Sequence, residues 1–203
     1  AYYRREDNQS DWILVKGNIP VVLGTRGLAW GVGLHGKPPI FQSELKTEGD
    51  LKSPAGVFQL SAVFGYAALS QMNALKMPYI QIDQMTECID DSQSIHYNRI
   101  RQRNRVKKVD WYSSERMADY GIYYKLGVIV DHNINPTIKK QGSCIFLHNW
   151  AGPNETMPGC TAMAPENMKA ITFWLDQENK PIFIQLSRYL YRYLKVEWHL
   201  PKI

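Results

Sequence analysis

The stretch GSCIFLHNWAGPNETMPGCTAM, residues 142–163, joins a short β-rich run to a cysteine that directly follows Pro158-Gly159. The run at residues 143–148 predicts a strand that ends at His148. The loop of residues 149–158 can fold back and bring Cys160 to that histidine. Four interpretations of Cys160 are open: a buried structural thiol, half of a disulfide, a metal ligand, or a nucleophile for which His148 is the base.

The segments around this stretch are also rich in β-forming residues. In residues 126–131, Leu126, Val128 and Val130 alternate with Gly127, Ile129 and Asp131, which predicts a strand. Further short strands are expected at residues 12–15, 20–23, 57–60 and 181–186. Gly17-Asn18 between the first two predicts a hairpin-like opening. The fold class is therefore mainly β with helical insertions.

Helices are expected in three places. Pro165 can occupy the first turn of a helix whose apolar residues recur at spacings of three and four. Ser187 can cap a C-terminal helix at about residues 188–198. Residues 66–120 are polar and mixed in period, so they are expected to form a mixed helical insertion, with one helix opening at Ser113-Ser114-Glu115.

Length and composition predict a single domain that spans residues 1–203. The chain has 203 residues, of which 44% are hydrophobic and 21% charged, which is enough for one core. No apolar run approaches the roughly 18 residues that a membrane span needs. The net charge of +5 favours anionic partners, but the basic tract at residues 99–108 has no aromatic stacking pattern, so no nucleic-acid partner is expected.

Metal binding is disfavoured by spacing. Cys144 and His148 point to one face of the predicted strand, but they lie about 13 Å apart at the rise of a strand, too far to share an ion. We therefore expect no metal and no cofactor.

A nucleophile needs a reachable sulfur, a base and backbone N–H groups aimed at the developing oxyanion. Gly159 permits a tight turn that would expose the N–H groups of residues 159 and 160. His148 would be the base. A backbone carbonyl or Asn149 would orient its ring.

These motifs together resemble the YkuD-like L,D-transpeptidase family. Residues 142–148 followed by Pro-Gly-Cys-Thr-Ala-Met at 158–163 resemble its active-site segment. Residues 48–58, EGDLKSPAGVF, are similar to its Gly-x-Lys-x-Pro-x-Gly-x-Phe segment, and residues 127–133, GVIVDHN, to the strand before its catalytic histidine. Pro158 and Ala162 stand where the best-known members carry a second histidine and an arginine.

The resemblance implies a β-sandwich-like core and a periplasmic or wall-facing location, reached through a removed signal peptide. It implies a cysteine L,D-transpeptidase that acts on peptidoglycan stem peptides and is acylated by carbapenem-type inhibitors. The alternatives are an L,D-carboxypeptidase, which hydrolyses the same thioester, and a catalytically silent wall-binding module.

Other residues keep two interpretations each. In an oxidising periplasm Cys88 and Cys144 could pair and leave Cys160 free, or both could be buried and reduced. Trp150 is either a lid or part of the core, and His132 is either structural or at the rim of the site. Both are candidate substrate-binding residues.

Overall fold

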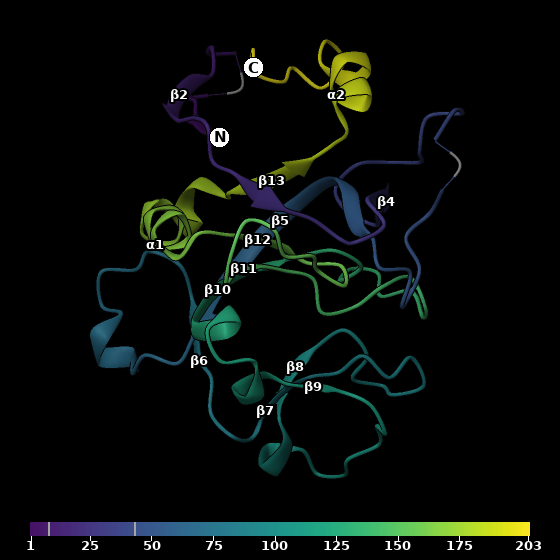
Figure 1. Ribbon diagram of the computed structural model, residues 1–203, viewed down its shortest axis with the longest axis vertical. Coiled ribbons are helices and arrows are strands. Elements are labelled where there is room, and N and C mark those ends of the chain that lie inside the picture. The colour runs from purple at the N-terminus through teal and green to yellow at the C-terminus, as the bar shows by residue number, and fades with distance from the viewer. Residues whose placement is uncertain (8, 43) are drawn as a thin grey trace.

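Strand β5 is the long strand of the main sheet, with which several other strands pair. The computed structural model in Figure 1 describes residues 1–7, 9–42 and 44–203. The main sheet has the strand order β13-β5-β10-β11-β12-β3, and β4 and β6 also pair with β5. Its strands are β3 (Val21–Val22), β4 (Leu28–Trp30), β5 (Ser53–Gly65), β6 (Tyr79–Gln81), β10 (Leu126–Val130), β11 (Phe146–Asn149), β12 (Thr161–Met163) and β13 (Ile182–Gln185). The expected mainly-β class is confirmed.

Helix α1 (Pro165–Trp174) covers one face of this sheet. Phe58 of β5, Val128 of β10 and Leu147 of β11 are buried in one cluster with Met168 of the helix. The alternation of side chains along each strand places these residues on a common face. Pro165 occupies the first turn of α1, as expected from its fixed φ.

The later part of the segment at residues 66–120 covers the opposite face, where Ile82, Cys88 and Met117 cluster with Phe64 and Phe146. Its strands β7 (Thr86–Cys88), β8 (Ile100–Gln102) and β9 (Glu115–Arg116) form a separate sheet in the order β8-β7-β9. Its helical turns are the 3-10 helices η1 (Leu69–Gln71), η2 (Arg103–Arg105) and η3 (Met117–Tyr120), and η4 (Tyr123–Lys125) follows.

The mixed helical insertion expected at residues 66–120 contains these 3-10 helices among its strands, but the helix expected to open at Ser113-Ser114-Glu115 is not found. Instead of opening a helix, Glu115 pairs with Cys88 across the β7–β9 ladder. Pairing with a distant strand outweighs the local capping pattern, because strand formation depends mainly on cross-strand packing.

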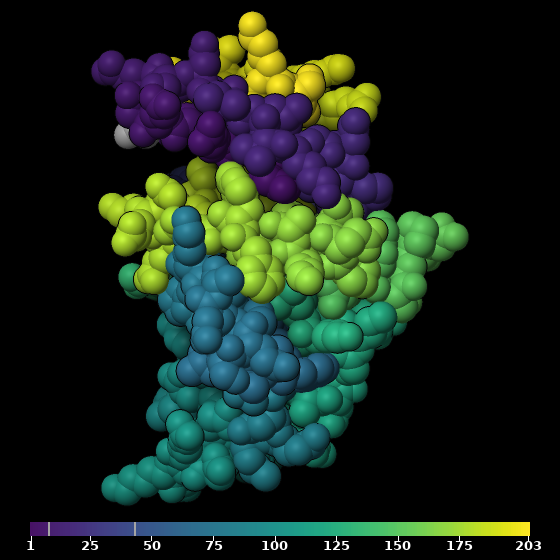
Figure 2. All heavy atoms as spheres, turned by 90° about the vertical axis from the view of Figure 1, so that its left-hand side faces the viewer, coloured from purple at the N-terminus to yellow at the C-terminus, as the bar shows by residue number. Residues whose placement is uncertain are grey.

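The two chain ends lie together at one end of the molecule (Figure 2). Strand β1 (Tyr2–Arg4) pairs with β2 (Ile13–Lys16), whereas β3 pairs with β12, so residues 12–23 do not form the expected hairpin. At the other terminus, Ser187 Oγ accepts a hydrogen bond from the Leu190 amide and caps α2 (Arg188–Leu194). This helix is shorter than the expected range of 188–198.

Candidate active site

His148 lies on β11, and Cys160 lies just before the neighbouring strand β12 of the main sheet. Strands β11 and β12 are parallel, and His148 is paired with Ala162. Cys160 immediately precedes β12, two residues before Ala162. Because residues two apart on an extended chain face the same side, the thiol and the imidazole share one face of the sheet. The ring of Tyr124 lies against this face, 5.4 Å from the His148 ring, and clusters with Cys160.

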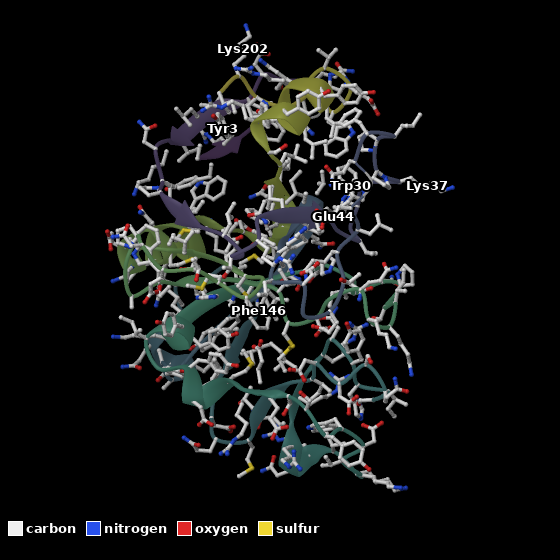
Figure 3. All side chains as sticks on the ribbon, turned by 45° about the vertical axis from the view of Figure 1, so that its right-hand side comes forward. Tyr3, Trp30, Lys37, Glu44, Phe146 and Lys202 are labelled. Atoms are coloured by element: carbon white, nitrogen blue, oxygen red, sulfur yellow. A yellow bond between two sulfur atoms is a disulfide. The ribbon has the colours of Figure 1, made fainter. Side chains whose placement is uncertain are left out.

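Backbone groups surround the Cys160 thiol. The sulfur accepts a hydrogen bond from the Phe146 amide at 3.3 Å and donates one to the Cys144 carbonyl at 3.4 Å. The residue is only 5% exposed. Figure 3 shows that the labelled Phe146 lies in the interior of the molecule. The thiol is therefore enclosed in this conformation.

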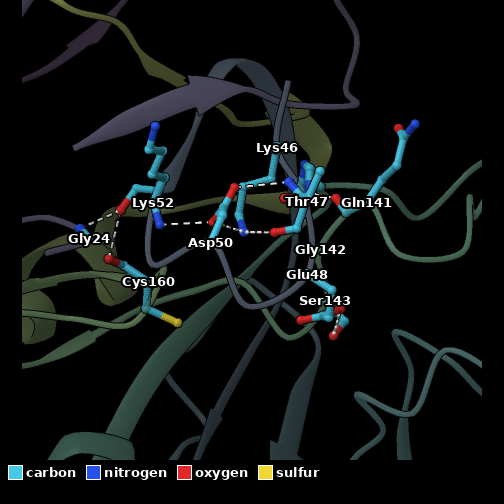
Figure 4. Close-up of polar contacts among 12 residues, drawn as sticks. Gly24, Lys46, Thr47, Glu48, Asp50, Lys52, Gln141, Gly142, Ser143 and Cys160 are labelled. Carbon is cyan, nitrogen blue, oxygen red and sulfur yellow. Dashed lines mark hydrogen bonds and ion pairs between the residues drawn. The ribbon is translucent and has the colours of Figure 1, made fainter. Parts of the chain in front are cut away.

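Residues of the 48–58 motif reach Cys160 through a buried serine. Ser53 Oγ donates to the Cys160 carbonyl at 3.0 Å and accepts from the Gly24 amide at 2.8 Å (Figure 4). Nearby, the buried Lys46 ammonium lies 2.7 Å from the Asp50 carboxylate. Two motifs that are far apart in the sequence thus meet at one point, since Ser53 and Cys160 are separated by 107 positions along the chain.

The electrostatic surroundings keep the thiol protonated. Burial raises the pKa of Cys160 far above its ordinary value, and the nearby Glu115 carboxyl raises it further. The hydrogen bond from the Phe146 amide opposes this shift because it favours the thiolate. Nucleophilic attack from this position requires a base that removes the proton.

His148 has the ionisation state of a base. Its Nδ1 lies 2.7 Å from the Asn149 carbonyl oxygen. A carbonyl can only accept, so Nδ1 carries the hydrogen and the lone pair is on Nε2. Burial lowers the pKa of His148, so the ring is neutral at pH 7. The orienting group is the backbone carbonyl of Asn149, while its side-chain Nδ2 donates to the Ile122 carbonyl.

Three residues beside the thiol were not predicted from the sequence. The Tyr124 hydroxyl donates to Glu115 at 2.6 Å, and the ring of Tyr120 stacks on Tyr124 at 4.4 Å between centroids. Burial raises the pKa of Glu115 to about 7. No local pattern marks these residues, because β9, η3 and η4 meet at this site only through tertiary packing.

Gly159 lies beside the thiol, but its backbone does not need a glycine. It is absent from the glycines with positive φ, and an added Cβ would lie 3.4 Å from Ile145 and from the Lys52 carbonyl. The chain bends at residues 158 and 159, and this bend does not require a glycine at position 159.

Both residues expected to bind substrate, His132 and Trp150, are buried in this structure. His132 Nδ1 accepts from the Val32 amide at 3.2 Å, and Nε2 donates to the Gln141 carbonyl at 2.8 Å, so the backbone uses both nitrogens of a fully buried ring. Trp150 packs in a small core cluster with Met157 and Ala162. In this conformation both side chains therefore contribute to packing of the fold.

A disulfide joins Cys88 to Cys144, with 6.0 Å between their Cα atoms, and Cys160 is free. The bond connects β7 of the smaller sheet to the loop before β11. It therefore fixes the residue whose carbonyl accepts the hydrogen bond from the Cys160 thiol.

Searches for relatives and for other kinds of site are negative. No protein-family model, curated protein or solved structure matches the chain. Within residues 1–7, 9–42 and 44–203, no group of three or more His, Cys, Asp or Glu side chains could hold a metal ion. In the same ranges, no helix has the length and apolar character needed to cross a bilayer.

Proposed function

We propose that the protein is a cysteine acyltransferase of the L,D-transpeptidase type, with Cys160 as nucleophile and His148 as base. The observation that carries the proposal is the pairing of β11 with β12. It puts a free thiol and a neutral imidazole on one face, with Nδ1 of the imidazole held by the Asn149 carbonyl. Cysteine nucleophiles are activated by such a base.

In the first half-reaction, Cys160 Sγ attacks the carbonyl carbon between meso-diaminopimelate and D-Ala. Nε2 of His148 takes the thiol proton and then gives it to the departing amine of D-Ala as the C–N bond breaks. A thioester remains on Cys160. In the second half-reaction, the amine of another stem peptide attacks this thioester, its proton passes to His148, and the thiol is restored with a new 3→3 cross-link.

The enclosed thiol adds a conformational step to this proposal. Tyr124, Tyr120 and Glu115 lie beside the sulfur, and a peptide carbonyl must reach it. We therefore place an opening of the η3–η4 segment, residues 117–125, before acylation. Excluding water after closure would favour transfer to an amine over hydrolysis.

Two rivals are distinguished by their products. An L,D-carboxypeptidase would pass the same acyl group to water. The low exposure of Cys160 and its raised pKa favour the other rival, a wall-binding module without catalysis.

The Cys88–Cys144 disulfide supports a periplasmic or wall-facing location, because disulfides persist in oxidising compartments.

Product analysis with purified disaccharide tetrapeptides tests the proposal. Cross-linked dimers indicate transpeptidation, tripeptides indicate hydrolysis, and unchanged substrate indicates the silent module. Cys160→Ala and His148→Ala should each abolish turnover. His199→Asn is the matched control, because His199 is exposed and has a positive φ that asparagine tolerates. Turnover that survives Cys160→Ala would refute the assignment.

A further inference from the structure

Helix α2 and the turn that follows it carry two different stripes of side chains on their outer side. Tyr189, Tyr193 and Val196 follow one another at spacings of four and three residues and are 65%, 56% and 83% exposed. The inner side is buried, since Leu190 and Leu194 pack against Trp30. The outer aromatic stripe is therefore not needed to hold the helix to the core.

The loop before β5 extends this apolar surface. The ring of Phe41 makes edge contacts with Tyr189 and Tyr193, at 5.2 and 4.8 Å between centroids. Ile40, next to it, is fully exposed. Two segments that are distant in sequence thus combine into one patch of aromatic and aliphatic side chains, which we call the α2 patch: Ile40, Phe41, Tyr189, Tyr193 and Val196.

Basic residues lie beside this patch. Arg188, Arg192 and Lys195 occupy the neighbouring stripe of the same helical segment, at the same spacings of four and three. Lys37 projects outward from the loop that carries Ile40 and Phe41 (Figure 3). Glu197 is the acidic residue in the described segment 188–203.

We propose that the α2 patch and its basic stripe bind the surface of a bilayer that carries anionic headgroups. Tyrosine rings are favoured at the boundary between headgroups and acyl chains, and aliphatic side chains gain free energy by burial there. Arginine and lysine beside them attract anionic headgroups. A hydrated anionic polymer would satisfy the basic stripe, but it would leave Ile40 and Val196 in water.

A second copy of the chain fits this surface less well. In a two-fold symmetric dimer the same patch faces itself, so the basic stripes of the two copies would be brought close together. Their like charges would repel. Charge complementarity therefore favours an anionic bilayer.

Vesicle sedimentation of the whole chain tests the proposal. We expect binding to vesicles of phosphatidylcholine mixed with phosphatidylglycerol, and much weaker binding to phosphatidylcholine alone. Arg188→Gln/Arg192→Gln/Lys195→Gln should weaken binding by about fivefold for each charge removed. Tyr189→Ser/Tyr193→Ser should weaken it at unchanged net charge.

The control removes the same charge elsewhere. The control variant is Arg105→Gln/Lys107→Gln/Lys108→Gln, in which three exposed residues after β8 are changed. Strand β8 lies at the opposite end of the molecule from α2 (Figure 1). This variant should bind like the unaltered protein. Equal loss in both triple variants, or no binding to anionic vesicles, would overturn the proposal. Tyrosine variants that bind as well as the unaltered protein would point to an anionic polymer or protein and would overturn it too.

Discussion

The Cys160 thiol donates a hydrogen bond to the carbonyl of Cys144, a residue that is itself joined to Cys88 by a disulfide. Cys144 has a φ of 54°, a left-handed conformation that is uncommon for residues other than glycine. Its amide donates to Asn98 at 2.9 Å. The disulfide and this hydrogen bond hold the segment that positions the free thiol.

Removing the disulfide should expose Cys160. In Cys88→Ser/Cys144→Ser, we expect alkylation of Cys160 by iodoacetamide to become faster, because the surrounding segment is released. The free energy of unfolding should fall by about 2–5 kcal/mol. Leu190→Ala, in a separate core cluster, is a control for general destabilisation and should leave alkylation nearly unchanged. Equal acceleration in both variants would contradict a local effect.

Carbapenem labelling should report on the base. Intact-mass spectrometry of the unaltered protein should show one adduct, and peptide mapping should place it on Cys160. His148→Ala should slow adduct formation by a factor on the order of 100 or more, because proton transfer by a positioned base contributes that much. An adduct formed at the same rate without His148 would argue against its role as base.

Glu115→Gln should make Cys160 easier to ionise. The carboxylate raises the pKa of the thiol, and glutamine removes its charge while keeping its shape. The pH profile of Cys160 alkylation should therefore shift to lower pH. Glu178→Gln, at an exposed position, should not shift it. A profile that does not move would show that the Glu115 charge has no influence on the sulfur.

Glu115 should also make stability depend on pH. Its pKa is raised from 4.5 to about 7 in the folded protein, so the folded state binds more protons than the unfolded state between these values. Its contribution to stability is therefore present at low pH and is lost as pH rises from about 4.5 to about 7. Urea unfolding at several pH values should show that Glu115→Gln lacks this loss. Parallel pH curves for both proteins would contradict the prediction.

Ser53→Ala should lower the stability of the fold at the candidate site. The hydroxyl bridges the Gly24 amide and the Cys160 carbonyl, and both groups are left without this partner in a buried position. We expect a loss of roughly 1–3 kcal/mol in the free energy of unfolding. Ser70→Ala, an exposed serine, is the control. A loss of the same size in both variants would refute a special role for Ser53.

Local sequence patterns were sufficient to predict several secondary-structure elements. The alternation in residues 126–131 predicts β10, Leu126–Val130, to within one residue, because Val128 and Val130 are buried in the core beside α1. Pro165 and the spacing of Met168 and Ile171 predict α1 in the same way. Each of these patterns reflects burial against the same core.

Non-local pairing decided other elements. The apolar run at residues 57–60 is only the middle of β5, which extends over Ser53–Gly65 because four other strands pair with it. The same effect turned Glu115 from an expected helix start into a strand residue. Propensity within a short window does not contain these partners.

The sequence by itself identified the candidate site residues: a histidine at a strand end, a cysteine after Pro158-Gly159, and two further cysteines able to pair. Only the tertiary structure decided that Cys88 and Cys144 are bonded, that the thiol is enclosed, and that Glu115 and Tyr124 lie beside it. The physical reason is that ionisation and exposure depend on atoms brought near by packing, and those neighbours come from distant parts of the chain.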